Sequence, residues 1–137
     1  MKNRASVIVV GVALVLAAGM WGLRTFAATP ITGFKRVELK RADLGVPGRE
    51  VVMARGEFDP GAVVPKHTHP GEEIAYVLEG EVTVEMAGKP PMVLKAGDVF
   101  FVPPGTVHSA KNASTAVTKV LSTYVVEKGK PLAALMK

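Results

Sequence analysis

Short apolar runs separated by glycine and proline make up most of the chain from residue 34 onward. None of them keeps the 3.6-residue period of an amphipathic helix, and residues 81–86, EVTVEM, alternate strictly between polar and apolar. Period-two alternation bounded by turn residues is typical of β-strands. We therefore expect about eight or nine strands, over residues 49–58, 63–69, 74–78, 81–86, 92–95, 99–102, 106–110 and 116–126.

This pattern predicts one all-β domain over residues 34–127, closed as a small barrel or packed as a sandwich. A closed barrel of about eight strands leaves no free sheet edge, and its interior can hold side chains or one small ligand. Residues 128–137 form a tail, for which we expect either a short helical turn or a segment packed across the barrel.

Residues 1–27 have the pattern of a targeting segment. A basic start, MKNR, precedes an uncharged apolar stretch over residues 5–23, and Thr25 and Ala27 fit the small residues of a cleavage site. We expect a helical secretory signal peptide that is removed. The apolar stretch approaches the ~20 residues that span a bilayer, so an uncleaved membrane anchor is the alternative. In both cases the rest of the chain works in the periplasm or is secreted, and it meets a membrane only if this segment is kept.

Charge and composition narrow the classes of function. The formal net charge is +5, but Lys2, Arg4 and Arg24 lie in the leader. The remainder has no run of basic residues interleaved with aromatic ones, so we exclude nucleic-acid binding. The chain also contains no cysteine, and any metal site must therefore use nitrogen and oxygen ligands.

The segment HTHPGEE, residues 67–73, contains two of the three histidines of the chain. On a strand, His67 and His69 point the same way because side chains repeat with period two, so they can share a metal ion. A polar surface turn is the simpler alternative. The residues alone do not choose between the neighbouring carboxylates Glu72 and Glu73 as a third ligand.

Two stretches that include these histidines resemble the two motifs of the cupin family. The first is Gly61-x5-His67-x-His69-x3-Glu73-x6-Gly80, and the second is Gly97-x5-Pro103-x-Gly105-x2-His108-x3-Asn112. The chain most resembles small single-domain bacterial cupins of the quercetin-dioxygenase-like kind. The resemblance implies a jelly-roll-like double-stranded β-helix, a homodimer, and one divalent metal ion inside the barrel held by His67, His69, Glu73 and His108.

Three imidazoles and one carboxylate leave open positions on an octahedral ion, and they suit Fe, Mn, Ni, Cu or Zn without selecting one. The resemblance implies a dioxygenase-type oxidoreductase acting on a small enol or carboxylate compound, with Glu73 as proton acceptor when it leaves the ion. A non-catalytic periplasmic module that binds a small molecule or a metal is the alternative. An isomerase or epimerase is disfavoured, because Lys66 alternates away from His67.

Five further residues are candidates for the pocket lining because they lie close to the ligands along the predicted strands: Met53, Arg55, Tyr76, Phe100 and Phe101. For the four uncharged residues we favour ordinary packing in the barrel over a role in the pocket. Arg55 must either face solvent or pair with an acid, and we favour solvent.

Overall fold

The computed structural model describes residues 31–136, and the leader expected at residues 1–27 lies outside this range. The described part contains ten strands, and none of its segments is a helix able to cross a membrane. The strands are β1 (Phe34–Asp43), β2 (Arg49–Phe58), β3 (Val63–Thr68), β4 (Gly71–Glu79), β5 (Glu81–Met86), β6 (Met92–Lys95), β7 (Val99–Val102), β8 (His108–Lys111), β9 (Thr118–Glu127) and β10 (Ala134–Leu135).

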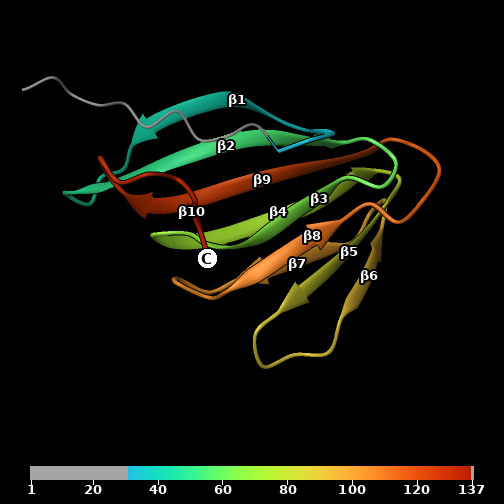
Figure 1. Cartoon of the computed structure of the whole chain (residues 1–137). Coiled ribbons are helices and arrows are strands. Elements are labelled where there is room, and N and C mark those ends of the chain that lie inside the picture. Colours follow the sequence, from blue (N-terminus) through green and yellow to red (C-terminus); the bar gives the residue numbers. More distant parts are fainter. Residues whose placement is uncertain (1–30, 137) are drawn as a thin grey trace, which may run out of the picture.

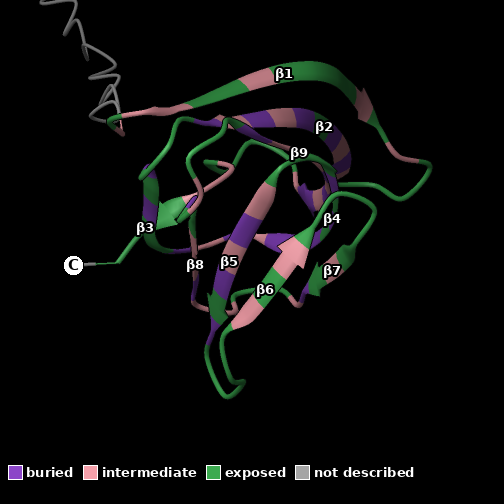
Figure 2. Ribbon diagram, turned by 90° about the vertical axis from the view of Figure 1, so that its right-hand side faces the viewer, coloured by how far each residue is buried: buried purple, intermediate pink, exposed green. Residues whose placement is uncertain are grey.

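The strands form two five-stranded antiparallel sheets that enclose one interior (Figures 1 and 2). The order is β1-β2-β9-β4-β7 in the first sheet and β10-β3-β8-β5-β6 in the second. Neighbours in each sheet come from distant parts of the chain, because β9 lies between β2 and β4, and β8 lies between β3 and β5. This is a jelly-roll arrangement, and it confirms the all-β prediction.

The core lies between the two sheets and is built largely from valine. Strands β2, β5 and β9 alternate between buried and less buried positions, which Figure 2 shows as bands of colour along β2. On β5, Val82, Val84 and Met86 are buried, as the alternation of EVTVEM predicts. β-Branched side chains suit such a pleated surface, and burying each one contributes about 1.5–3 kcal/mol.

Two residues within the histidine-bearing motifs are explained by close packing. A Cβ atom on Gly71 would lie 2.0 Å from the carbonyl oxygen of Val125, so only glycine lets β4 approach β9 here. The buried amide of Asn112 donates to the carbonyl oxygens of Phe58 and Ala116, at 3.1 and 2.7 Å. These contacts hold the loop after β8 against the end of β2, which fixes the frame around the site.

Strands β1 and β10 extend the sheets beyond the strands expected from the sequence. Strand β1 pairs with β2 along its length and is mostly exposed. In β10, Ala134 and Leu135 pair with Thr68 and His67 of β3. The C-terminal tail therefore packs across the barrel, beside a strand that carries a histidine.

Candidate metal centre

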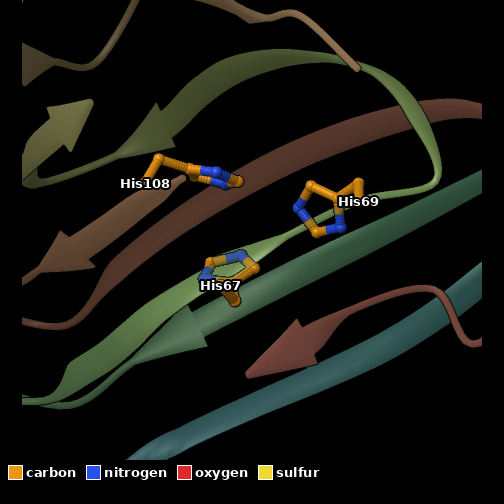
Figure 3. Close-up of side chains that lie close together, drawn as sticks. All are labelled: His67, His69 and His108. Atoms are coloured by element: carbon orange, nitrogen blue, oxygen red, sulfur yellow. The ribbon is translucent and has the colours of Figure 1, made fainter. Parts of the chain in front are cut away.

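The three histidines meet in the interior of the barrel. His67 lies on β3, His69 directly follows β3, and His108 begins β8. The register pairs His67 with His108, so the two residues are neighbours across the sheet. All three are buried, and their ring nitrogens lie within 4.8 Å of one another (Figure 3). Buried histidines at such spacing form a site that can hold a metal ion.

Each imidazole is fixed by a backbone carbonyl at its Nδ1 atom. The pairs are His67 with Pro65, His108 with Thr106 and His69 with Leu132, at 2.8, 3.0 and 2.6 Å. A carbonyl oxygen only accepts, so each Nδ1 carries the proton and donates it. The Nε2 atoms of the neutral rings then hold free lone pairs, which is the tautomer that binds a metal.

Glu73 adds a buried carboxylate to the three rings. It lies on β4, with its Oε2 atom 3.0 Å from Nε2 of His69 and 3.4 Å from Nε2 of His108. Glu73 faces the histidines because Gly71 and Glu73 alternate inward, while Glu72 is less buried and points outward. Glu73 is the carboxylate that the motif spacing selected.

The contact between Glu73 and His69 lacks a good hydrogen bond. Nε2 of His69 is fully buried and has no hydrogen-bond partner among the described residues, although the carboxylate oxygen is 3.0 Å away. A ring lone pair facing a carboxylate is unfavourable unless a cation lies between them. The donor set of three imidazoles and one carboxylate therefore fits a divalent transition-metal ion.

The electrostatics of the site keep the imidazole of His67 neutral and the carboxylate of Glu73 charged. Burial, together with the charge of His108, lowers the pKa of His67 to about 4. Burial raises the pKa of Glu73, but His108 and His69 outweigh burial and hold that pKa below its ordinary value. In these states His67 and Glu73 can bind a cation at neutral pH without first losing a proton.

A cavity of about 50 Å³ lies against the site. Its wall is mostly apolar, and its polar members besides the ligands are Arg36, Ser122 and Tyr124. The ring of Tyr124 lies 4.8 Å from that of His69, and burial raises the pKa of the Tyr124 hydroxyl, which therefore stays protonated. This space can hold a few water molecules or a small ligand.

The structure places the five pocket candidates on different faces. Phe100 lines the cavity. Met53, Tyr76 and Phe101 are exposed on the outer face, because each alternates with an inward neighbour on its strand. Arg55 also points outward, and it pairs with Glu57 at 2.7 Å, so its charge is balanced at the surface.

Sequence reasoning did not identify Arg36, Ser122, Tyr124 or Leu132. The alternation of β9 carries a usable signal, since Ser122 and Tyr124 share the inward phase of the strand. Arg36 lies on β1, whose alternation is masked by charged residues. Leu132 contributes its backbone carbonyl oxygen, which holds His69, and a pattern of side chains does not reveal such a backbone contact.

Comparison with known proteins identifies the family. The family described as "Cupin domain" matches residues 47–124, and the chain therefore belongs to the cupin family. The chain is 38% identical over 85 residues to germin-like protein subfamily 2 member 2 of Arabidopsis thaliana, which covers 58% of this chain and 39% of that protein. It thus spans well under half of this plant relative.

Solved structures agree with this assignment. An RmlC-like cupin from Shewanella frigidimarina superposes with a TM-score of 0.56 at 32% identity, covering 71% of this chain and 79% of the other. Oxalate oxidase in complex with the substrate analogue glycolate superposes with a TM-score of 0.63 at 27% identity, covering 80% of this chain and 57% of the other. Together with its three buried histidines, this similarity supports a metal-binding cupin.

Proposed function

We propose that the protein is a metal-dependent oxidoreductase of the dioxygenase type that acts on a small enol or carboxylate compound. One observation carries this proposal: three imidazoles, each anchored at Nδ1 by a backbone carbonyl, converge with a charged carboxylate beside a small cavity. A bound Fe, Mn, Ni or Cu ion would supply Lewis acidity and redox chemistry at this point. The similarity to oxalate oxidase, at 27% identity, supports a small carboxylate compound as the substrate.

The residues of this chain have distinct roles in the proposal. His67, His69 and His108 hold the ion, and their carbonyl partners keep Nε2 pointed inward. The apolar wall offers few hydrogen-bonding partners to water, while the Tyr124 hydroxyl offers a hydrogen bond to the substrate. Glu73 would accept a proton from the substrate if its carboxylate were not bound to the ion.

A non-catalytic binding module is the second candidate, and one observation favours it. Among the residues that line the cavity, Glu73 is the only carboxylate. If Glu73 stays bound to the ion, no separate base remains on the wall, and the cavity would hold a small molecule without converting it.

Oxygen consumption separates the two candidates. Metal-loaded protein is mixed with a panel of small enols and carboxylates, and oxygen uptake is followed with an electrode. The oxidoreductase proposal expects uptake that depends on substrate and that is lost in His69→Ala. Saturable binding without uptake for any member of the panel would favour the binding module.

We also propose that the protein works outside the cytoplasm as a homodimer. Export is supported by the leader pattern of residues 1–27. A dimer is supported by the outer face of the first sheet, where exposed Ile74 and Tyr76 of β4 pair with Phe101 and Val99 of β7. Contiguous exposed apolar side chains of this kind mark interaction surfaces, and a second copy of the chain would cover them.

A further inference from the structure

The C-terminal tail, residues 128–136, crosses from one sheet to the other beside the candidate metal ligands. It leaves β9 in the first sheet and ends in β10, which pairs with β3 in the second sheet (Figure 1). On the way, the carbonyl oxygen of Leu132 accepts the Nδ1 proton of His69 at 2.6 Å. Leu135 then lies opposite His67 in the register. The tail therefore contacts two of the three histidines.

Few contacts hold the tail in place. Apart from Leu132 and Ala133, which are half-buried, its residues are exposed. Strand β10 is only two residues long, and beyond it the amide of Met136 donates to the carbonyl oxygen of Lys66 at 2.9 Å. Segments that bury little apolar surface open locally at a small cost in free energy, without unfolding of the domain. The tail can therefore open while the two sheets stay folded.

The tail covers a surface that would otherwise be exposed. The Leu132 side chain packs on a buried apolar cluster formed by Val52, Ala54, Tyr124 and Val126. Strand β10 is also the last strand of its sheet, so the edge of β3 is unpaired wherever the tail has opened. Unpaired strand edges and exposed apolar patches are surfaces to which other chains bind. An open tail would therefore present an interaction surface that a docked tail hides.

An ion on His69 would strengthen the docking of the tail. A cation at Nε2 withdraws electrons from the imidazole, so the Nδ1 proton becomes a stronger donor to the Leu132 carbonyl. A supporting hydrogen bond of this kind changes metal affinity about tenfold to a hundredfold. Linkage is reciprocal, so bound metal should stabilise the docked tail by the factor with which the docked tail raises metal affinity.

We propose that the C-terminal tail is a metal-dependent latch. It covers the apolar cluster and the edge of β3 when the histidine site holds an ion, and it releases them when the site is empty. This inference rests on the metal site of the proposed function, and it is independent of any reaction with oxygen. The tail then reports on the protein surface whether the buried site is loaded.

Hydrogen–deuterium exchange, followed by mass spectrometry, measures the opening of the tail directly. Metal-free wild type is compared with protein saturated with Zn(II) and with protein in the same concentration of Mg(II), which prefers oxygen ligands. The turn of residues 95–98 is the internal reference, because its amides bond to Val77 and Gly80, away from the tail. Zinc content is measured on the same samples.

Two variants separate packing of the tail from its coupling to the ion. Leu132→Ala keeps the backbone carbonyl and loses packing on the apolar cluster, so its tail should exchange faster in both forms and still respond to Zn(II). His69→Ala removes the link between the ion and the carbonyl, so its tail should exchange at one rate with and without Zn(II).

Zn(II) should slow exchange of the wild-type tail about tenfold to a hundredfold, which is more than it slows the reference turn, and Mg(II) should have no effect. Zinc-loaded wild type whose tail exchanges as fast as that of the metal-free protein would overturn this inference alone. A zinc effect in His69→Ala as large as in wild type would do the same. Wild type that takes up no Zn(II) would overturn the metal site of the proposed function and this inference with it.

Discussion

The C-terminal tail fixes one of the metal ligands, and removing it should weaken metal binding. The carbonyl oxygen of Leu132 accepts the Nδ1 proton of His69 at 2.6 Å, and β10 holds the tail against β3. A chain ending at Lys130 loses both contacts. Loss of such a supporting hydrogen bond typically lowers metal affinity about tenfold to a hundredfold, or about 1.4–2.7 kcal/mol.

The fold should survive this truncation. The tail adds only a two-residue strand and the Leu132 side chain, which packs on Val52, Ala54, Tyr124 and Val126. The sheets themselves are unchanged, so we expect cooperative unfolding with a loss of about 1–2 kcal/mol. Thermal unfolding followed by circular dichroism checks this point before metal binding is compared.

Competition with a chromophoric chelator for Co(II) at neutral pH measures the affinity. A second truncation, ending at Ala133, provides the matched control, because it removes β10 and keeps the Leu132 carbonyl. We expect the Ala133 form to retain most of the wild-type affinity. A folded chain ending at Lys130 that binds Co(II) as tightly as wild type would refute the role of this carbonyl.

Three other predictions concern packing, pH and assembly. Gly71→Ala should destabilise the protein by about 3 kcal/mol or more in a urea titration, because the added Cβ atom would lie 2.0 Å from the carbonyl oxygen of Val125. The control Gly45→Ala, which has open space around it, should change the free energy of unfolding little. Metal-free protein should lose up to about 3 kcal/mol of stability as the pH falls from 6.5 to 4. The reason is that the pKa of His67 falls from 6.5 to about 4 on folding, so the unfolded chain takes up the proton first. A free energy of unfolding, measured by urea titration, that stays constant across this range would contradict this prediction. Phe101→Glu should shift a dimer to a monomer in analytical ultracentrifugation, and a wild-type protein that sediments as a monomer would rule the dimer out.

The alternation of side chains predicted much of the fold. Over residues 81–86 the buried positions of β5 follow the EVTVEM pattern, because one face packs on the core and the other meets solvent. Strand β1 escaped prediction because Arg36, Glu38 and Arg41, which lie opposite buried residues of β2, are themselves charged and exposed, so that β1 shows no alternation of apolar and polar residues.

The site was predictable only where side chains carry the signal. The resemblance to the two cupin motifs implied His67, His69, Glu73 and His108 as ligands, and these four residues lie close together in the structure. The carbonyl that holds His69 comes from 63 residues away in the chain, so no local pattern could reveal it. The outward positions of Met53, Tyr76 and Phe101 likewise follow from the register of the sheet and not from closeness in sequence.

The metal content of the protein tests the central claim most directly. Wild type and a His67→Ala/His108→Ala double variant are produced identically, and elemental mass spectrometry measures the transition metals bound per chain. We predict close to one ion per chain in wild type and almost none in the double variant, in which two of the three converging Nε2 atoms are removed. Wild type that holds no metal, even after reconstitution, or a double variant that holds as much as wild type, would contradict the metal centre.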